Sequence, residues 1–561
     1  MKILAILTIF IVSIFAKEFT SIKYQGDIDV IGEFDRATLL KVCNIDYPPI
    51  YKFWRDDPTF PSSKIKTYIK NIKSYASSVG YFKAEVKAHT DDKTIFITIK
   101  KNQPINISTI KIDKNFANLF SMREGDRFRV KDFKSAKDGM SRYMKEVGFA
   151  KFILKTKAYV DLKSYKVDID VDFSLGKLYS FGETTVDNTN ANVSKELIKK
   201  KLKYKKGDLY DIRKLEDSYE SLYKSGVFKD IEVTKKDTNS SDLPLHIKLV
   251  EGKSKEFRSS IGYDTEDGLQ VGAGIWYNNF LGNFKRFGLE GRVSQRGYKV
   301  KNLFYNPELF LKSSFQNDIS CEDWDYDTYE QELLTLRSTF GREFFGLKHY
   351  FGFLHENSRI TSHSLEIKSG RYTINSLFYK LVIDKRDNFL NATKGWYYSL
   401  YLERALYDLS SDFDYLKQEH EFRYIKSSSK KLIHALKFRL GKVNKDVPLF
   451  KRFYSGGSMS NRGYEYRQVG KLDADGNPIG GNTMLNLSLE SRYEVIPSVW
   501  VVGFIDSTRI STEIDKFNSK TFSSVGFGAR YISVIGPIRV DIGFPMDDGG
   551  FSFHLGIGQV F

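Results

Sequence analysis

Alternating apolar and polar residues fill the C-terminal half of the chain, from about Glu256 to Phe561. In the run Leu485–Arg492 the leucines point to one side, and Asn486, Ser488 and the charged residues point to the other. A period of two residues is that of a β-strand. About 16 such runs, each of roughly 10 residues, can be drawn. Apolar residues outside and charged residues inside suit lipid around a wet lumen. The pattern therefore predicts a transmembrane 16-stranded antiparallel β-barrel over residues 253–561.

The last run, Phe551–Phe561, has two unequal faces. One face carries the apolar residues Phe551, Phe553, Leu555, Ile557 and Phe561. Gly556 and Gly558 lie on the other face and have no side chain to pack, which weakens the strand. We therefore predict a seam where this strand meets the first one, near Glu256–Tyr263, and expect the barrel to be able to open there.

The N-terminal half repeats itself three times before the barrel begins. Each repeat closes a helix-like stretch with a glycine, at Gly80, Gly148 and Gly226, which suits a left-handed helix end. The expected order in each repeat is strand, helix, helix, strand, strand. We predict three α+β domains, over residues 17–101, 102–176 and 177–252. Their exposed sheet edges could bind an extended peptide through main-chain hydrogen bonds, although inert spacers are the alternative.

The first 16 residues are typical of a secretory signal peptide, with Lys2, an apolar stretch and a plausible cleavage site after Ala16. A membrane helix is the alternative, but the run is shorter than the roughly 20 residues that a span needs. An exported chain with a lipid-facing barrel is expected in the outer membrane of a Gram-negative cell, with the three repeats in the periplasm.

Composition narrows the class of protein. The chain has 561 residues, 34 Tyr, 44 Phe and a mean hydropathy of -0.39, which excludes a bundle of membrane helices. The net charge of +17 indicates either a solvated lysine-rich surface or attraction to anionic lipid or acidic client segments. Nucleic acid is not expected as a partner of an exported chain. Cys43 and Cys321 fall in different predicted domains, so no structural disulfide is expected.

No enzyme, cofactor or metal site is predicted. Ser455 to Ser460 contains no Gly-x-Ser-x-Gly elbow. Asp473–Asn477 is similar to the start of a calcium loop, but Pro478 and Met484 occupy its Gly and Glu positions.

A Gly-rich interval between two strand runs carries Asn461-Arg462-Gly463-Tyr464. We expect this loop to fold inward, so that Arg462 pairs with Glu490 and Asp506 on two strands. A guanidinium offers planar, paired donors that lysine cannot copy. Gly463 is expected to let the backbone turn where a side chain would clash. A latch that only helps the barrel to fold is the alternative role.

These features resemble the BamA/TamA family of outer-membrane assembly barrels with polypeptide-transport-associated (POTRA) domains. The loop matches the family's Arg-Gly-aromatic signature, although Asn461 replaces the usual Val. Gly503–Asp506 matches the strand that supplies the acidic partner of the loop. The terminal Phe561 strand matches the recognition signal of outer-membrane proteins.

A fourth feature is a tight turn between two middle strands. Its matching residues are Asp384, Arg386, Asp387 and Gly395, and Ala392 replaces the usual Pro. The resemblance extends over essentially all of the chain after residue 16.

The resemblance implies an assembly factor that captures β-rich clients and inserts or translocates them through the seam. Three repeats are most similar to TamA, which would imply a TamB-like inner-membrane-anchored partner and autotransporter or phospholipid cargo. A BamA-like general insertase and a two-partner-secretion pore are the alternatives. Such a pore would carry two POTRA domains and a plug helix, for which Ala16 and the first strand leave no room. A passive porin would need neither the repeats nor the loop.

Overall fold

The computed structural model describes residues 18–48, 55–188, 192–236, 239–310, 313–364, 367–514, 516–517, 519–533, 536–547, 549–557 and 560–561. The expected signal peptide, residues 1–16, and Gly558 lie outside the described residues. The chain forms two compact units. One comprises Met1–Thr185, Lys201–Ser221 and Val233–Ile247, and the other comprises Val186–Lys200, Leu222–Glu232 and Lys248–Phe561.

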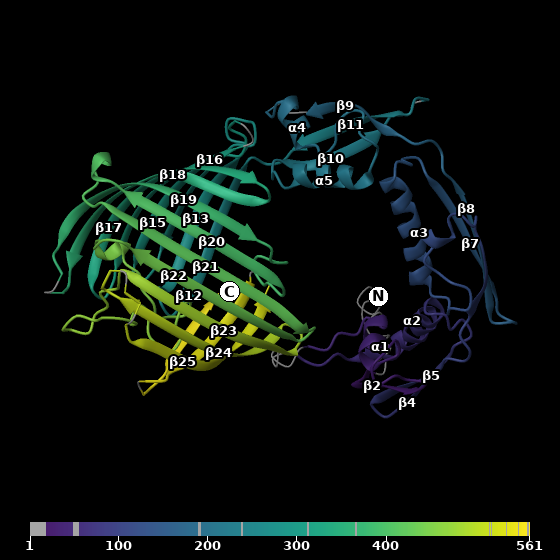
Figure 1. Cartoon of the computed structure of the whole chain (residues 1–561). Helices are drawn as coiled ribbons and strands as arrows, with labels where there is room; N and C mark the ends of the chain where they lie inside the picture. The colour runs from purple at the N-terminus through teal and green to yellow at the C-terminus, as the bar shows by residue number, and fades with distance from the viewer. Residues whose placement is uncertain are drawn as a thin grey trace, which may run out of the picture. The chain divides into compact units, whose positions relative to one another are not determined.

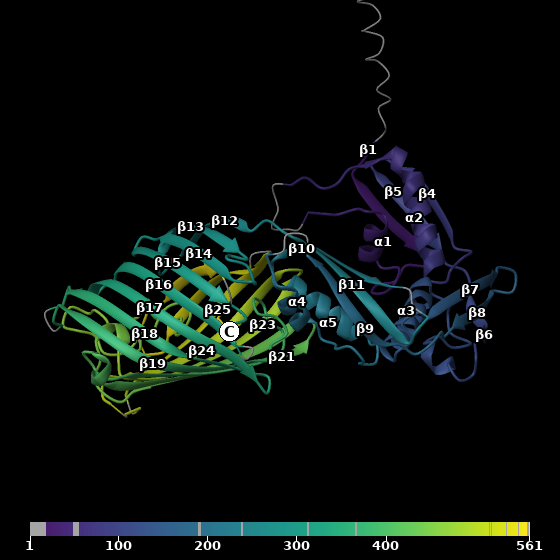
Figure 2. The same ribbon diagram turned by 90° about the horizontal axis from the view of Figure 1, so that it is seen from above.

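The C-terminal half is an antiparallel sheet of 16 strands in chain order, as predicted (Figure 1). The strands are β12 (Lys255–Asp264), β13 (Gly268–Asn278), β14 (Arg286–Val293), β15 (Gly297–Asn306), β16 (Ser314–Asp325), β17 (Tyr329–Phe344), β18 (Leu347–Ser362), β19 (Gly370–Asp384), β20 (Gly395–Ala405), β21 (Tyr415–Ser429), β22 (Leu432–Val443), β23 (Thr483–Ile496), β24 (Val499–Ser511), β25 (Thr521–Ser533), β26 (Gly536–Pro545) and β27 (Ser552–Ile557). Figure 2 shows the same strands from above, curving round to form the barrel wall.

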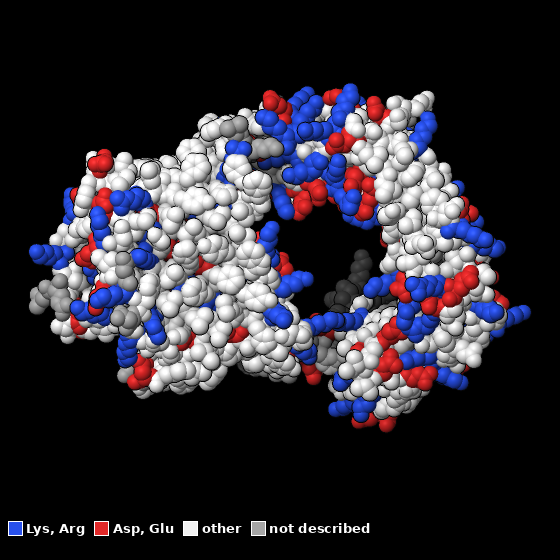
Figure 3. Space-filling view, viewed as in Figure 1, with Lys and Arg blue, Asp and Glu red and all other residues white. Residues whose placement is uncertain are grey.

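The two faces of the barrel wall follow the predicted alternation. On β12, Phe257, Ile261 and Tyr263 are exposed on the outer face. In Figure 3 the middle of the barrel is largely free of coloured charged side chains, and charges gather toward its left end in this view. Such an uncharged band is what a hydrocarbon layer requires.

The expected seam lies between β12 and β27. The sheet order runs from β12 to β27, and among the described residues no strand ladder joins the two ends. The Thr265 amide, just past β12, donates to the Leu555 carbonyl over 3.3 Å. Among the described residues, β27 pairs with β26 from Ser552 to Ile557. The barrel is therefore nearly closed, with one weakly joined edge.

The last strand is shorter than predicted, and Phe561 does not share its outer face. Phe551, Phe553 and Ile557 are exposed as expected, but Phe561 is only 3 % exposed. Val560 and Phe561 lie outside β27, so the period of two does not extend to Phe561. Its ring lies instead in an apolar cluster that includes Val560, Ala392, Ile425, Ile433 and Ala435. The alternation alone could not show where the strand stops.

The N-terminal half contains three small sheets beside helices. The first repeat contains β1 (Glu18–Phe19), β2 (Ser21–Gly26), α1 (Arg36–Val42), β3 (Phe60–Pro61), η1 (Ser62–Lys64), α2 (Ile65–Ser78), β4 (Glu85–Asp91) and β5 (Thr94–Lys100). The second contains β6 (Asn106–Lys111), η2 (Ala117–Leu119), α3 (Val130–Glu146), β7 (Ile153–Asp161) and β8 (Lys166–Ser174). The third contains β9 (Ser180–Asn188), α4 (Lys195–Lys201), α5 (Ile212–Tyr223), β10 (Phe228–Lys235) and β11 (Asp242–Glu251).

Each repeat places its last strand in the centre of a three-stranded sheet, in the orders β2-β5-β4, β6-β8-β7 and β10-β11-β9. The expected left-handed glycines are confirmed, with φ of +99° at Gly80, +106° at Gly148 and +70° at Gly226. The second repeat departs from the prediction, because its first helix is only the 3-10 turn η2. Among the described residues, no helix has the length and apolar character needed to cross a membrane.

Candidate functional site at the inward loop and the seam

The segment between β22 and β23, residues 444–482, enters the lumen of the barrel. Its buried residues include Phe453, Ser455, Ser458, Asn461 and Tyr464, and Asn461 and Arg462 are fully buried. The loop therefore fills space that would otherwise hold water.

Arg462 lies between two carboxylates from adjacent strands. Its Nε and Nη2 donate to the two oxygens of Asp506 on β24, over 2.8 and 3.0 Å. Its backbone N–H donates to Asp506 Oδ2 over 3.0 Å. Its Nη1 donates to Glu490 Oε2 on β23 over 2.5 Å. Both carboxylate side chains are fully buried. The structure thus brings the three residues singled out in the sequence into one ion-paired cluster.

The cluster is larger than the sequence predicted. Arg530 on β25 donates to both oxygens of Asp541 on β26, over 2.7 and 3.1 Å. Arg492 Nε donates to the second oxygen of Glu490 over 2.7 Å. Arg530 Nη2 also reaches Glu490 Oε2 over 3.3 Å. In the sequence, Asp541 and Arg492 occupy polar positions of alternating runs, which indicates that they face the lumen. Only the fold shows that they meet.

Asp506 shares its lumenal face with apolar residues. Val502, Phe504 and Ile510 are all buried on the same side of β24. The Arg462 guanidinium carbon lies 3.5 Å from the centroid of the Phe504 ring, a cation–π contact. The expectation that inward-facing residues are polar fails on β24. The loop fills the lumen there, so the inward side chains pack against protein and not against water.

Gly463 is required for space rather than for a turn. A Cβ at this position would lie 2.3 Å from Ser524 Cβ on β25. Its φ is not in the left-handed region, in contrast to Gly456 and Gly457, with φ of +101° and +92°. On β26, a Cβ at Gly543 would lie 2.1 Å from the Arg462 carbonyl oxygen. Gly463 in the loop and Gly543 in the wall therefore allow the two backbones to approach each other closely.

The residues that flank Arg462 are also bonded to the wall. Asn461 Nδ2 donates to the Phe522 carbonyl over 2.9 Å, and its Oδ1 accepts from Ser524 Oγ over 2.7 Å. The amide that replaces the family's Val thus has polar partners. The Tyr464 hydroxyl donates to Asp547, and its ring packs edge-on against Phe522 with centroids 5.7 Å apart.

A second buried charge attaches the start of the loop. Lys451 forms ion pairs with Glu403, over 2.7 Å, and with Glu356. The hydroxyls of Tyr415 and Tyr401 donate to Glu403 over 2.5 and 2.9 Å. No pattern in the sequence pointed to this attachment, because its members lie on three separate strands and the loop.

The loop touches both sides of the seam. The Ser458 amide donates to Glu266 Oε1, in the turn after β12, over 2.6 Å. The Ser458 carbonyl and hydroxyl accept from Arg539 on β26, over 2.5 and 2.8 Å. His554 Nε2 on β27 lies 3.1 Å from the Arg462 carbonyl oxygen. One loop segment therefore bridges the first and last strands from inside.

The middle turn, between β19 and β20, is closed by its acidic residues. Arg386 donates through Nε and Nη2 to Asp384, over 2.9 and 2.8 Å. Asp387 accepts from the Thr393 amide over 2.8 Å and from its hydroxyl over 2.5 Å. Gly395 has a φ of +113°, which favours glycine. Successive strands of the barrel run in opposite directions, so every even-numbered strand ends on the side where the first strand, β12, begins. β19 is the eighth strand, and the turn after it therefore lies on that side.

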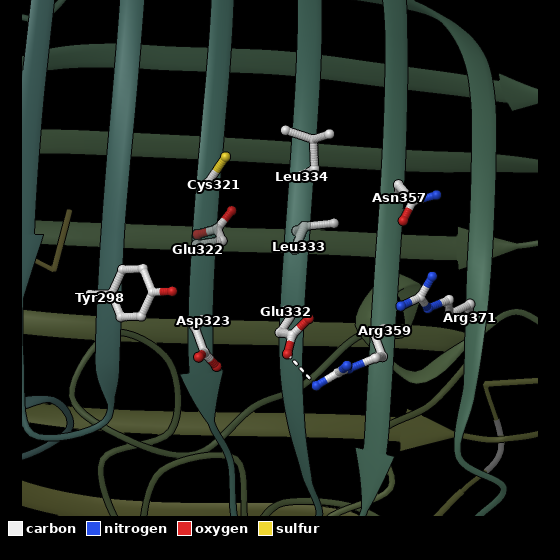
Figure 4. Close-up of a pocket in the computed structure, with 10 residues that line it drawn as sticks. All are labelled: Tyr298, Cys321, Glu322, Asp323, Glu332, Leu333, Leu334, Asn357, Arg359 and Arg371. Carbon is white, nitrogen blue, oxygen red and sulfur yellow. Dashed lines mark ion pairs between the residues drawn. The ribbon is translucent and has the colours of Figure 1, made fainter.

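Figure 4 shows a pocket on the barrel wall across β15 to β19. Arg359 on β18 forms an ion pair with Glu332 on β17. Cys321 on β16, Leu334 on β17 and Asn357 on β18 lie side by side further along the wall. No group of three or more metal-ligating side chains occurs in the described part of the chain.

Comparison with known proteins agrees with this geometry. The Omp85 superfamily domain matches residues 279–561, and a repeat described as surface antigen variable number repeat (POTRA) matches residues 179–252. The chain belongs to the Omp85 superfamily. It is an outer-membrane β-barrel with periplasmic POTRA domains.

Two curated relatives are named outer membrane protein assembly factor BamA. The protein from Nitratidesulfovibrio vulgaris is 24 % identical over 450 residues, which cover 75 % of this chain and 56 % of the relative. The protein from Neisseria meningitidis is 20 % identical over 628 residues, which cover 96 % of this chain and 78 % of the relative. The chain thus spans little more than half of the first relative.

A solved structure, BamA from Haemophilus ducreyi lacking POTRA domains 1–3, has the same fold. Its TM-score is 0.64 with 17 % sequence identity, covering 81 % of this chain and 99 % of that chain. These relatives carry the BamA name, so the similarity supports the family and not TamA specifically.

Proposed function

We propose that this protein is a BamA-like insertase, which receives unfolded outer-membrane proteins from the periplasm and inserts them through its seam. The observation that carries this proposal is the edge between β12 and β27. Thr265 and Leu555 share a hydrogen bond there, but among the described residues no ladder joins the two strands. An unpaired strand edge is a template for another strand.

The exposed edges of the repeat sheets are the proposed capture sites. In the second repeat, β7 pairs with the central β8 on one side, and among the described residues no strand pairs with its other side. An extended client could add to such an edge with little demand on its sequence. The work is mechanical rather than enzymatic.

The ion-paired cluster around Arg462 is proposed to hold the inward loop in place while the seam opens. The loop contacts Glu266 on one side and His554 on the other. The loop can therefore stabilise the closed seam. Because Arg462 also attaches the loop to β23 and β24, the loop would stay bound to these strands when the seam opens.

Cross-linking the seam tests the function. The chain with Thr265→Cys and Leu555→Cys, in a Cys321→Ala background, is reconstituted in liposomes with a urea-unfolded outer-membrane barrel as client. We expect cross-linking to stop client insertion, measured by protease protection, and reduction to restore it. Undiminished insertion through a cross-linked seam, or a large stable conductance without insertion, would contradict the proposal. The second result would favour a secretion pore.

A TamA-like function is the second candidate, favoured by the three repeat sheets. Recovery of a large inner-membrane-anchored, TamB-like partner with the full chain would support it. This partner, and autotransporter or phospholipid cargo, would then replace general client insertion.

A further inference from the structure

We infer that the lysines of α4 form a binding surface for anionic phospholipid headgroups of the periplasmic leaflet. All but the last residue of α4 (Lys195–Lys201) belong to the same compact unit as the barrel. The inference goes beyond client insertion and does not depend on it, because it rests on where α4 lies relative to the membrane.

Aromatic side chains mark the level of the membrane interface below α4. Tyr277 on β13, Phe280 in the following turn and Phe287 on β14 form a cluster, with ring centroids 5.4 and 5.2 Å apart. Aromatic girdles of barrels lie at the headgroup level. The turn after β13 is periplasmic, because β13 is the second strand after the periplasmic repeats. Leu281 in this turn is 74 % exposed.

The start of α4 is bonded to this turn. The Ser194 amide donates to Asn283 Oδ1 over 3.0 Å, and the Asn283 amide donates to the Asn192 carbonyl over 2.9 Å. Both ribbon views show α4 beside the barrel rim (Figure 1 and Figure 2). A seven-residue helix is about 10 Å long. All of α4 therefore lies within about a Debye length, roughly 8–10 Å, of the turn.

Further contacts hold this part of the third repeat on the same turn. Arg286 Nη2 donates to the Ser225 carbonyl over 2.6 Å. The rings of Phe228 and Phe284 pack edge-on with centroids 6.0 Å apart. α4 is thus fixed near the interface.

The charge of α4 suits an anionic surface. Lys195, Lys199 and Lys200 are exposed, and Glu196 is the one acidic residue of the helix, 3.3 Å from Lys200. Lys201 ends the helix, and Lys203, Lys205 and Lys206 follow in the sequence. In Figure 3 the Lys and Arg colour gathers where Figure 1 places α4. A lysine ammonium is a point charge on a flexible side chain, in contrast to the rigid, planar guanidinium of arginine. Such charges suit many exchanging headgroups better than the specific binding of one lipid.

Hydrogen exchange of the full chain in nanodiscs tests this inference. The discs contain either phosphatidylcholine alone or equal parts of phosphatidylcholine and phosphatidylglycerol. We expect exchange of the α4 amides to slow at least about fivefold in the anionic discs, the factor that corresponds to one lysine at such a surface. High salt should abolish the difference, because it screens exposed charges.

The variant Lys195→Gln/Lys199→Gln/Lys200→Gln should lose this protection. Its matched control, Lys155→Gln/Lys157→Gln/Lys166→Gln, removes three exposed lysines from the second repeat and should keep it. Retained heat-modifiable mobility in gels shows that both variants fold. Equal α4 exchange in the two discs would overturn the inference. Protection by added polyglutamate but not by phosphatidylglycerol would also overturn it, in favour of an acidic protein segment.

Discussion

The Arg462 side chain and the Asp506 carboxylate meet in a two-pronged pair, with Nε and Nη2 each donating to a different oxygen over 2.8 and 3.0 Å. Neither side chain is exposed to solvent. Burying two charged side chains costs free energy unless each finds hydrogen-bond partners. Removing either side chain would therefore leave the other buried without this partner. The backbone amide of Arg462 supplies a third donor to the same carboxylate.

Replacement of Arg462 by Ala should destabilise the barrel by about 3–5 kcal/mol, because Asp506 would stay buried without the guanidinium that bonds both of its oxygens. Glu490 would keep its bonds from Arg492 and Arg530. Arg462→Lys should fall between Ala and the wild type, since it keeps the charge but not the fork. The temperature at which the barrel loses its compact mobility in gels measures both effects.

Arg509→Ala is the control for these variants, because Arg509 lies on β24, the strand of Asp506, but is exposed. It should leave that temperature nearly unchanged. If both Arg462 variants keep wild-type gel mobility and client insertion, the loop is not an anchor.

Glu266 should stabilise the closed seam through the Ser458 amide, 2.6 Å away. Glu266→Ala removes the acceptor and should weaken closure by about 1.5–3 kcal/mol, the range for a hydrogen bond to a charged group. Glu266→Gln keeps an acceptor oxygen and should lose less. The yield of the Thr265→Cys/Leu555→Cys cross-link reports closure of the seam. If Glu266→Ala and Glu266→Gln give equal yields, Glu266 does not stabilise the closed seam.

Gly463→Ala should cost about 1–3 kcal/mol of stability, because the new methyl group would meet Ser524 Cβ at 2.3 Å. Adding Ser524→Gly removes that atom. The double variant should therefore be more stable than the sum of the two single changes predicts, as measured by thermal unfolding. Strict additivity would show that the two positions do not touch.

Burial raises the pKa of the Cys43 thiol from 9.0 to about 11. Because the folded value is the higher one, Cys43 contributes stability below pH 9 that is lost as the pH rises through 11. In the Cys321→Ala chain, maleimide should label folded Cys43 far more slowly than urea-unfolded Cys43 at pH 8. The decline in stability from pH 9 to 11 should be shallower in Cys43→Ala. Rapid labelling of the folded chain would contradict the burial of this thiol.

Local patterns predicted the strands well where one face meets lipid. In β23, Leu487 and Leu489 are exposed outside while Asn486 and Ser488 are buried inside, as the alternation indicates. The pattern failed where the lumen is filled by protein. Phe504 and Phe561 face inward because loop and wall residues pack there in place of water.

The repeat glycines were also predictable, since Gly80 and Gly148 end helices whose apolar period stops there. The missing helix of the second repeat was not, because the short stretch Ala117–Leu119 has no length over which a helical period can be read. The Lys451 attachment and the role of Ser458 at the seam were equally hidden from local pattern.

The sequence by itself determined a 16-stranded barrel behind three repeats, and it singled out Arg462 with Glu490 and Asp506. Those inferences rest on period, spacing and a short motif, which are local properties of the chain. Only the tertiary structure decided that Arg530 and Asp541 complete the buried cluster, and that Gly463 is needed for its closeness to Ser524. It also placed the start of α4 against the turn between β13 and β14. Contacts between distant segments depend on how the sheet closes and where the loop enters, and no local period encodes that.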